Sequence, residues 1–353
     1  MTGNMIAIIG AQYGSEGKGV VVSSIANEYD VHIRVGSPNA GHTFYWKDDL
    51  HIMQTIPCGW INPKAKIVIG RGALINIESL KRELLHIETY FPDFRKRFFI
   101  DSKAGILLQE YKDEEGGLTG EYNRCIGSTG EGVGIARIHR IKRKIGDFQF
   151  FGDIASSFGL DGIVAHNTPQ MIAEWQDMGL NILLEGTQGC SLSLVHGPWP
   201  YVTSIDTNAS QLLSEIGIAP FRLNQVLIVA RTFPIRVAGN SGVLKDEINW
   251  RILSDDLGRN VYEETTVTKR ARRIGKWDDE LIEKAILLNK PTSMALTFID
   301  YIDSACLGIS EKKSITKKAW HFINGIEERY HIPISIIGTG GKELNTIRLI
   351  DQL

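Results

Sequence analysis

Short apolar runs that end in glycine or polar residues recur along the whole sequence. They occupy residues 5–9, 66–69, 181–184, 225–230, 294–298 and 334–337. Strands that are apolar throughout, rather than at alternate positions, are typical of a parallel sheet covered on both faces. The pattern therefore predicts a buried, mainly parallel sheet.

Amphipathic segments with helix start and stop signals lie between these runs. Asn76 precedes one of them, and asparagine is a preferred N-cap residue. Asp278 or Asp279 is placed to cap a second helix, and a third, over residues 317–330, has to end before Pro333. The apolar positions with helical spacing are Ile77, Leu80, Leu84 and Leu85 in the first helix, and Leu281, Ile282, Ala285 and Leu288 in the second.

The alternation of strands and helices predicts an α/β fold. We expect a single large domain over residues 1–353, with a mainly parallel central sheet flanked by helices. The polar segment 239–260 is expected to be a loop-rich excursion. In open α/β sheets ligands bind at the carboxyl ends of the strands, so a site is expected in the loops that follow the apolar runs.

The composition is that of a globular protein and excludes several classes of function. Of 353 residues, 43% are hydrophobic and 23% charged, and the net charge of −2 gives no reason to expect nucleic acid or a membrane as a general partner. The start of the sequence lacks the basic and apolar regions of a signal peptide, so a cytoplasmic protein is expected. The cysteines lack zinc-site spacing and are expected to be buried free thiols; they are Cys58, Cys125, Cys190 and Cys306.

The loop after the first apolar run carries a clear chemical signal. It reads IIGAQYGSEGKG, with glycines at positions 10, 14, 17 and 19 around Glu16 and Lys18. A strand that leads into a glycine-rich helix start delivers backbone N–H groups and one cation to a phosphate. The loop is P-loop-like but is not a Walker A motif, which would need glycine in place of Gln12 and serine or threonine in place of Gly19. It predicts a nucleotide site of another family.

With its other motifs, the chain resembles the adenylosuccinate synthetase family. The matching segments are QYGSEGKGV, NAGHT, IGSTG, EGTQG, YVTS, TTVTKRARR, TFID and IGTGG. They run in the family's order over nearly the whole chain. Each segment alone is weak evidence, whereas the ordered series is specific.

This resemblance implies a two-step ligase. The γ-phosphate of a purine triphosphate moves to O6 of a purine monophosphate, and the amine of aspartate then displaces that phosphate at C6. Phosphoryl transfer of this kind needs positioning and charge stabilisation rather than covalent help from the protein. The implied catalytic residues are Ser15, Lys18 at the phosphate, His42 as a proton or hydrogen-bond donor, and Gln188 at the base and O6. The implied Mg²⁺ ligands are Ser15 and the backbone carbonyl of Gly41.

The resemblance also implies three binding subsites. For the donor nucleotide the residues are Gly14, Glu16, Gly17, Lys18, Gly19, Gly41, His42, Thr43, Arg272, Phe298, Asp300, Gly338, Gly340 and Gly341. For the purine monophosphate they are Ser15, Asn39, Ser128, Thr129, Arg143, Gln188, Thr203, Val237 and Arg270. For aspartate, whose carboxylates suit guanidinium groups beside hydroxyls, they are Thr266, Val267, Thr268, Arg270 and Arg272. Arg143 matches the family arginine that reaches the substrate of a partner subunit, which implies a homodimer.

The sequence departs from the family pattern at Ser15. The family has an aspartate there, which binds Mg²⁺ and takes the proton from N1 of hypoxanthine, whereas serine is a poor base and a weaker metal ligand. One interpretation is loss of activity. In the other, the shorter side chain makes room for the 2-amino group of guanine and accepts its hydrogen bond. The N1 proton would then go through Ser15 to water or phosphate, or to Glu16.

The second interpretation matches a phage-associated branch of the family. These 2-amino-2′-deoxyadenylo-succinate synthetases add aspartate to C6 of dGMP on the route to diaminopurine DNA, and a phage-encoded member would work in the host cytoplasm. The branch uses ATP or dATP. Phe298, where the family has a lysine, can stack on any base and agrees with an adenine donor, although Asp300, the family's reader of guanine, is kept. Gly338 replaces a family serine, and Ala238 a family glycine near the expected sugar, where the choice between ribose and deoxyribose stays open.

Three functions are compatible with these motifs. The first is the ligase that uses dGMP. The second is an ordinary adenylosuccinate synthetase that uses IMP and GTP, against which Ser15 and Phe298 speak. The third is a nucleotide-binding regulator or GTPase, which would have no use for the arginines of the aspartate loop.

Overall fold

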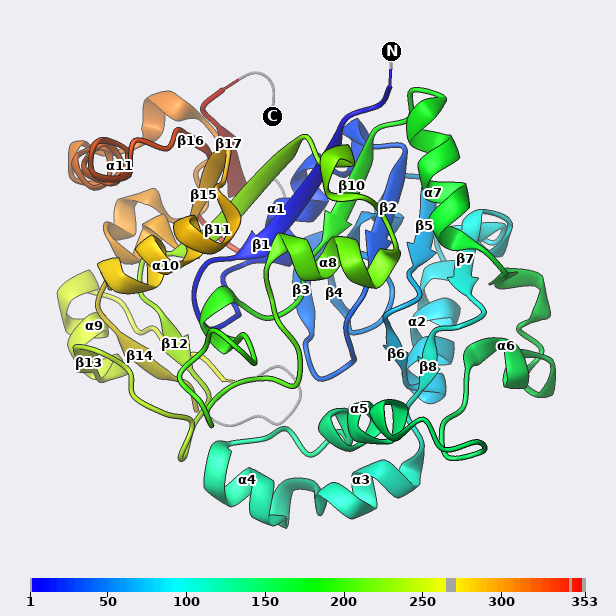
Figure 1. Ribbon diagram of the computed structural model, residues 1–353. Helices are drawn as coiled ribbons and strands as arrows, with labels where there is room; N and C mark the ends of the chain where they lie inside the picture. Colours follow the sequence, from blue (N-terminus) through cyan, green and yellow to red (C-terminus); the bar gives the residue numbers. More distant parts are fainter. Residues whose placement is uncertain (1, 265–270, 343–344, 351–353) are drawn as a thin grey trace.

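A ten-stranded sheet forms the centre of the computed structural model, which describes residues 2–264, 271–342 and 345–350 (Figure 1). The strand order is β17-β16-β15-β11-β1-β10-β2-β5-β7-β9. All neighbouring strands are parallel except β16 and β17. The strands are β1 Met5–Gly10, β2 Val31–Arg34, β5 Lys66–Ile69, β7 Phe98–Asp101, β9 Val164–Ala165, β10 Ile182–Glu185, β11 Gln225–Arg231, β15 Ser293–Thr297, β16 Ile334–Gly338 and β17 Thr346–Arg348. The predicted α/β class and mainly parallel sheet are confirmed.

Each of the six predicted strands is present, and each lies in this sheet. The apolar pattern missed the other four strands, which are β2, β7 and the short strands β9 and β17. Polar residues interrupt β2 and β7: His32 and Arg34 lie in β2, and Asp101 ends β7. These polar side chains are buried, so their strands lack the continuous apolar character on which the prediction depended.

Helices cover both faces of the sheet (Figure 1). The α-helices of the described residues are α1 Lys18–Ile25, α2 Ile77–Glu88, α3 Gln109–Glu115, α4 Glu121–Ile126, α5 Val133–Lys142, α6 Phe151–Ile154, α7 Thr168–Asp177, α8 Ala209–Ile216, α9 Trp250–Leu257, α10 Asp279–Asn289 and α11 Lys317–Tyr330. Helices α1, α2 and α6 share one core with Ile6 and Ile8 of β1, and α7, α8, α10 and α11 share the other with Met5, Ala7 and Ile9. Successive side chains of a strand point to opposite faces, and fully burying a large apolar side chain is worth roughly 1.5–3 kcal/mol. A strand that serves two cores is therefore apolar at every position.

The predicted helix caps are present. Asn76 accepts a hydrogen bond from the N–H of Ser79 (2.9 Å), and Asp278, rather than Asp279, accepts one from Glu280 (3.1 Å). The predicted helix over residues 317–330 is α11. The assignment of Leu85 to the apolar face of α2 is wrong, because Leu85 is 64% exposed and Ile87 completes the buried stripe instead.

Smaller sheets, separate from the central one, lie at its carboxyl edge. They are the hairpin β3 His42–Trp46 and β4 Asp49–Met53, the pair β6 Leu74–Ile75 and β8 Gly105–Ile106, and an antiparallel sheet of β12 Ile235–Arg236, β13 Glu247–Ile248 and β14 Arg273–Gly275. The segment 239–260 is less loop-rich than expected, since it contains β13 and α9. Of the residues of α9 only Leu253 is buried, so its apolar signal is weak.

Three of the four cysteines are buried, as expected. Cys58, Cys190 and Cys306 are buried, but Cys125, near the end of α4, is exposed, so the expectation of a buried thiol is wrong there. Across the described residues we find no helix with both the length and the apolar character needed to cross a membrane.

Candidate active site

The loop between β1 and α1 lies where several parallel strands end, and close backbone packing joins it to their loops. A Cβ atom added at Gly19 would lie 3.1 Å from Cβ of His42 and 3.1 Å from the carbonyl of Thr43. One added at Gly17, whose φ is 84°, would lie 3.3 Å from the methyl group of Thr297 at the end of β15. The positive φ and the close approach both explain glycine here.

Glu16 and Lys18 form a buried pair inside this loop. Oε1 of Glu16 accepts hydrogen bonds from the N–H groups of Gln12 (3.0 Å) and Gly14 (2.8 Å), and Oε2 lies 2.6 Å from Nζ of Lys18. Nζ also donates to the carbonyl of Gln188 (2.5 Å). Both carboxylate oxygens of Glu16 are thus occupied by hydrogen bonds within the loop, so Glu16 is a poor candidate for the base at N1. Lys18 connects the loop to the segment that follows β10.

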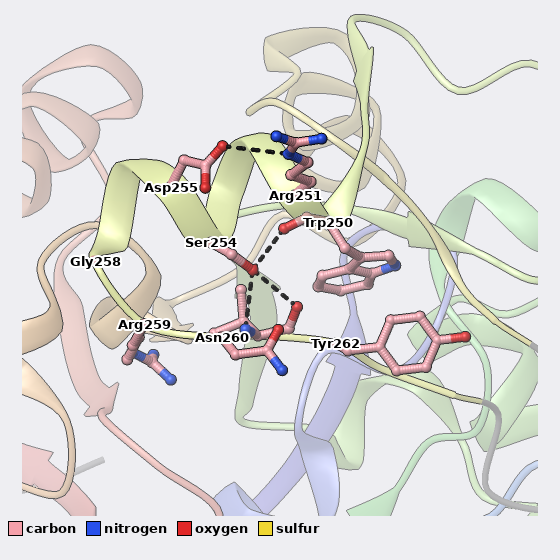
Figure 2. A pocket seen from close by; sticks show the side chains of 9 residues that line it. Trp250, Arg251, Ser254, Asp255, Gly258, Arg259, Asn260 and Tyr262 are labelled. Carbon is pink, nitrogen blue, oxygen red and sulfur yellow. Dashed lines mark hydrogen bonds and ion pairs between the residues drawn. The ribbon is translucent and has the colours of Figure 1, made fainter.

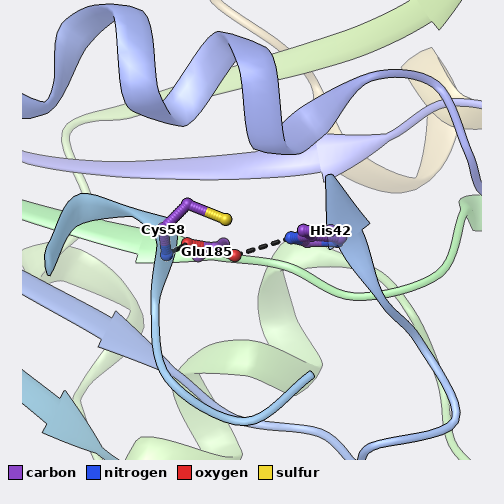
Figure 3. A group of neighbouring side chains, drawn as sticks. All are labelled: His42, Cys58 and Glu185. Atoms are coloured by element: carbon purple, nitrogen blue, oxygen red, sulfur yellow. Dashed lines mark hydrogen bonds and ion pairs between the residues drawn. The ribbon is translucent and has the colours of Figure 1, made fainter. Parts of the chain in front are cut away.

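His42 and Glu185 form a buried hydrogen-bonded pair at this edge (Figure 3). Nδ1 of His42, at the start of β3, lies 2.6 Å from Oε1 of Glu185, the last residue of β10. The same oxygen accepts from Nη1 of Arg34 (3.1 Å), and Oε2 accepts from the N–H of Cys58 (2.7 Å). All these side chains are buried.

The protonation states in this cluster follow from burial and the arginine. Burial, and then the charge of Arg34, lower the pKa of His42 to about 4. Burial opposes ionisation of Glu185, but the hydrogen bond with His42 and the charge of Arg34 outweigh it and lower its pKa to about 2. At neutral pH a neutral imidazole therefore donates its Nδ1–H to an ionised carboxylate, and Nε2 is left as an acceptor.

The trio of His42, Cys58 and Glu185 has the spacing of a metal site but not its chemistry. Its potential ligand atoms lie within 4.8 Å of one another. However, burial raises the pKa of the Cys58 thiol well above its usual value, and Arg34 already places a cation on Glu185. A second cation would be repelled there, so we assign these residues to proton or hydrogen-bond chemistry.

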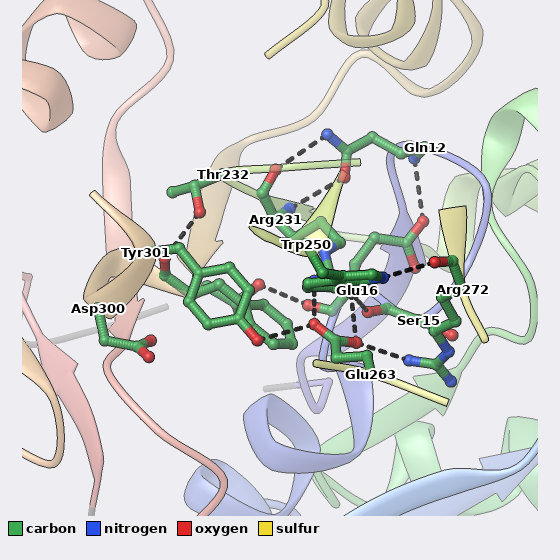
Figure 4. A network of polar contacts seen from close by, with 12 residues as sticks. Gln12, Ser15, Glu16, Arg231, Thr232, Trp250, Glu263, Arg272, Asp300 and Tyr301 are labelled. Atoms are coloured by element: carbon green, nitrogen blue, oxygen red, sulfur yellow. Dashed lines mark hydrogen bonds and ion pairs between the residues drawn. The ribbon is translucent and has the colours of Figure 1, made fainter. Parts of the chain in front are cut away.

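A second carboxylate, that of Glu263, is only 14% exposed and lies on the β11–β15 side of the loop (Figure 4). It accepts from Nη2 of Arg231 (2.5 Å), from Nη1 of Arg272 (2.9 Å) and from the hydroxyl of Tyr301 (3.0 Å). Burial opposes its ionisation, but Arg231 and then Arg272 lower the pKa of Glu263 to about 2. Arg272, expected to meet substrate anions, is thus paired with a carboxylate of its own chain.

Arg231 connects the glycine loop to this network. Its Nη1 donates to the carbonyl of Ser15 (3.2 Å), and its guanidinium carbon lies 3.9 Å from the centre of the Phe298 ring. Its backbone exchanges two hydrogen bonds of 3.0 Å with the side-chain amide of Gln12. Ser15 is exposed and has a φ of 56°, so the contact with Arg231 helps to hold a backbone shape that serine seldom adopts.

The expected donor residues of the C-terminal part lie at the ends of β15 and β16. Phe298 and Asp300 follow β15, and a Cβ atom added at Gly338 would lie 3.2 Å from the methyl group of Thr297. The next loop holds Gly340 and Gly341, whose carbonyl accepts from Tyr45 of β3 (3.3 Å). Nη2 of Arg259 lies 2.5 Å from Oδ2 of Asp300, and burial raises the pKa of Asp300 to about 6 against the effect of Arg259.

The expected monophosphate residues are partly brought together. The N–H of Thr203 donates to the carbonyl of Leu192, which places it beside the segment after Gln188 (2.8 Å). Asn240, three residues after Val237, donates to the carbonyl of Cys125 (2.8 Å) and so joins that segment to the loop with Ser128 and Thr129. Asn39 accepts from Ser37 (2.7 Å), and Ser128 donates to Glu115.

Two groups of expected residues are not joined to the others. Arg143 is exposed at the end of α5, and within the described residues no hydrogen bond or ion pair links it to another site residue. Thr266, Val267, Thr268 and Arg270 lie outside the described residues.

A cavity of about 770 Å³ lies between α9 and the segment that follows it, and none of the residues expected from sequence lines it (Figure 2). Its walls include Trp250, Ser254, Arg259 and Tyr262. Arg259 connects it to the site, because the same side chain is paired with Asp300.

Sequence reasoning missed the charged residues behind the site. The strands β2, β10 and β11 each end in a charged residue, which is Arg34, Glu185 and Arg231 in turn. A charged residue at the end of a buried strand was therefore the sequence signal that could have identified these site residues. Glu263 and Arg259 lie between α9 and β14, where no comparable signal exists.

Comparison with known proteins gives consistent matches. A model of the adenylosuccinate synthetase family matches residues 7–154 and 160–308. The adenylosuccinate synthetase of Methanocaldococcus jannaschii is 36% identical over 98% of this chain and 97% of its own, and that of Archaeoglobus fulgidus is 33% identical over 94% of each.

Two solved structures have a similar fold. One is the cyanophage S-2L succinoaminodeoxyadenylate synthetase (PurZ) bound to dGMP and dATP as an energy donor, with a TM-score of 0.83, 29% identity, and coverage of 99% of this chain and 96% of its own. The other is fully ligated adenylosuccinate synthetase from Plasmodium falciparum, with a TM-score of 0.84, 21% identity, and coverage of 99% and 100%.

Proposed function

The chain belongs to the adenylosuccinate synthetase family, and we propose that it is the member type that joins L-aspartate to C6 of dGMP, with ATP or dATP as the phosphoryl donor. The coarser activity follows from the family: the protein is a C–N ligase that forms a succino-purine nucleotide. The choice of dGMP depends on one observation, which is the environment of Ser15.

Ser15 presents a small hydroxyl where a purine edge is expected. Its side chain is exposed and makes no hydrogen bond among the described residues, while its carbonyl is held by Arg231. A hydroxyl oxygen can accept a hydrogen bond from an exocyclic amine, and it needs less space than a carboxylate. Guanine has such an amine on C2 and hypoxanthine has none. The PurZ structure, which holds dGMP, supports the same choice.

His42 is proposed to act on the oxygen that joins O6 to the transferred phosphate. In the ligand-free state Nε2 is an acceptor, because the pKa of His42 is lowered to about 4. A phosphate beside Nε2 adds negative charge, and Glu185 lies on the other side of the ring, so both groups favour the imidazolium once substrate is bound. The imidazolium then donates from Nε2, while Gln188 and Lys18 hold the base and the phosphate.

The loop offers Mg²⁺ few protein oxygen ligands. The oxygens proposed to hold the ion are the hydroxyl of Ser15 and the carbonyl of Gly41, since both oxygens of Glu16 are engaged. Mg²⁺ in nucleotide sites keeps several waters and takes phosphate oxygens of the substrate, so few protein ligands suffice. When bound, the ion would neutralise charge on the donor phosphates.

A homodimer of single-domain subunits is also part of the proposal. Ile138 and Ile141 on α5 are 43% and 73% exposed, and Ile145, two residues beyond Arg143 at the C-cap of this helix, is 100% exposed. Exposed apolar side chains at this spacing suit an interface with a second copy. In such a dimer Arg143 would reach the monophosphate of the partner subunit.

An ordinary adenylosuccinate synthetase is the second candidate. It is favoured by the archaeal relatives, which are more identical to this chain than PurZ is. In that case IMP would be the acceptor and GTP the donor.

Turnover of three acceptors separates these functions. The protein is supplied with aspartate, Mg²⁺ and ATP or GTP, and formation of the succino-nucleotide is compared for dGMP, GMP and IMP. Use of dGMP in preference to IMP supports the proposal, and use of IMP without dGMP rejects it. Phosphate release that does not depend on aspartate would instead indicate a regulator or GTPase.

A further inference from the structure

The ion pair of Arg259 and Asp300 lies beside the proposed path of the donor nucleotide. Phosphates bound at the loop before α1 would be close to the end of β15, because Gly17 packs against Thr297. Gly338, at the end of β16, packs against the same threonine. A nucleotide that runs along these strand ends brings its base toward Phe298 and Asp300, which follow β15.

Asp300 is not a lone carboxylate. Nη2 of Arg259 lies 2.5 Å from Oδ2 and 3.3 Å from the backbone carbonyl of Asp300. The side chain of Asp300 is 6% exposed and that of Arg259 is 26% exposed, so the arginine covers the carboxylate from the more open side. Arg259 also lines the cavity of about 770 Å³.

The guanidinium of Arg259 has N–H donors that the pair with Asp300 does not use. Nε of Arg259 has no hydrogen-bond partner among the described residues, and the hydrogen bonds found for this side chain there use Nη2 alone. A buried donor without a partner carries a desolvation cost, which a ligand acceptor within reach would remove. The pair thus offers a base one acceptor, on Asp300, and further N–H donors, on Arg259.

This pattern suits adenine better than guanine. A lone carboxylate offers two acceptors, which match the N1–H and the 2-amino group of guanine. Because Arg259 occupies Oδ2 of Asp300, guanine would lose one of these two acceptors, and its O6 would be left with a guanidinium N–H as a new partner. Adenine would find both groups that it needs, an acceptor for its 6-amino group and a donor for N1 or N7.

We propose that Arg259 sets the donor specificity of the enzyme, because its pairing with Asp300 selects an adenine nucleotide over a guanine nucleotide. This inference rests on the proposed function in one respect only, namely that the donor base lies at the ends of β15 and β16. It does not depend on whether the acceptor is dGMP or IMP.

Arg259→Leu tests the proposal, with Arg251→Leu as the matched control. Arg251 lines the same cavity, is 89% exposed and has only a loose contact with Asp255 (3.8 Å). The ratio of kcat/KM for ATP to that for GTP is measured with whichever acceptor the wild type uses. The assay pH is kept well above neutral, because without Arg259 nothing from that side chain opposes the rise that burial causes in the pKa of Asp300. We expect Arg259→Leu to lower this ratio roughly 10-fold or more, mainly through better use of GTP, and Arg251→Leu to change it less than about 2-fold.

A second variant shows whether the gain with GTP comes from the Asp300 oxygen that the loss of Arg259 leaves unpaired. In Arg259→Leu with Asp300→Asn the gain with GTP should disappear, because an amide offers only one acceptor. An unchanged ratio in Arg259→Leu, or a gain with GTP that persists in the double variant, would overturn the proposal.

Calorimetric binding of the non-hydrolysable analogues of ATP and GTP repeats the test without turnover. It keeps the inference testable if no acceptor is converted, which would be a failure of the proposed function and not of this one. Should Arg259→Leu fail to fold, Asp300→Asn alone is expected to weaken binding of the ATP analogue and leave that of the GTP analogue unchanged. Equal losses for both analogues would contradict the assignment.

Discussion

Two carboxylates, one on each side of the glycine loop, have similar acidity and different partners. The pKa values of Glu185, which is buried, and Glu263, which is 14% exposed, are both lowered to about 2. Glu185 binds one arginine and His42, whereas Glu263 binds two arginines and a tyrosine. The first carboxylate is therefore linked to the histidine that we propose to change its protonation state, and the second balances the charge of two arginines.

The two clusters also differ in how the fold builds them. Glu185 and Arg34 are paired residues in the register of neighbouring strands β10 and β2, so the sheet itself places them. Glu263 comes from the segment between α9 and β14 and meets Arg231 at the end of β11. The sheet register therefore places the carboxylate that holds His42, the proposed general acid, whereas the carboxylate that holds Arg231 and Arg272 comes from an irregular segment.

Loss of the histidine is expected to have the largest effect. His42→Ala should lower kcat roughly 10²–10⁴-fold, as for removal of a general acid, and should leave nucleotide binding close to that of the wild type. Steady-state turnover and calorimetric binding measure the two effects. The control is His166→Ala, an exposed position that should keep full activity. A loss of less than about 10-fold would remove His42 from the chemistry.

Neutral substitution of the two carboxylates separates their roles. Glu185→Gln and Glu263→Gln should each destabilise the protein by about 3–5 kcal/mol, because each leaves a buried arginine without its full counter-charge. Urea unfolding measures this change, with Glu88→Gln, in an exposed pair with Arg95, as a control expected to lose less than about 1 kcal/mol.

The same two variants should differ in their kinetics. Glu185→Gln should lower kcat, and Glu263→Gln should mainly raise the KM for aspartate or the donor nucleotide. Identical changes in both parameters would show that the two clusters are not functionally distinct.

The low pKa of His42 makes the stability of the metal-free protein depend on pH. An unfolded histidine has a pKa of about 6.5, so between pH 6.5 and about 4 the unfolded state binds a proton that native His42 does not. The free energy of unfolding should therefore fall as the pH is lowered through this window, by at most about 3 kcal/mol from this residue.

Urea midpoints at pH 7 and pH 5 in the presence of a chelator test this slope. His42→Asn should reduce the slope without abolishing it, because buried His32 also has a pKa of about 4 and contributes in the same direction. A slope that His42→Asn leaves unchanged would mean that native His42 binds its proton as readily as an unfolded histidine does, so that its pKa is not lowered by folding.

The smallest of these effects concerns the residues far from both clusters. Arg143→Ala should raise the KM for the purine monophosphate about 10-fold and leave kcat nearly unchanged, with Lys144→Ala as a neighbouring exposed control. In a dimer that shares Arg143 between subunits, an equal mixture of Arg143→Ala and His42→Ala proteins should reach roughly a quarter of the wild-type activity at a purine monophosphate concentration well below the KM, because about half of the dimers are hybrids with one intact site. No recovery on mixing would contradict the shared site.

Much of the fold was predictable because burial on both faces leaves a simple mark on the sequence. The apolar runs of β1, β5, β10, β11, β15 and β16 were recognised, whereas the buried charges of β2 and β7 disguised those strands. The motif residues around the glycine loop were also predictable. Glu263 and Arg259 were not, because their positions depend on long-range packing of an irregular segment, and no local pattern records with which arginine or carboxylate they pair.

The proposed preference for dGMP depends on a hydroxyl at position 15, so the most direct measurement is the ratio of kcat/KM for dGMP to that for IMP in the wild type and in Ser15→Asp. A longer, charged side chain should crowd the 2-amino group and restore a base for N1 of hypoxanthine, so we expect this ratio to exceed one in the wild type and to fall at least about 10-fold in the variant. If Ser15→Asp used dGMP as well as or better than the wild type does, Ser15 would not be the residue that selects the acceptor.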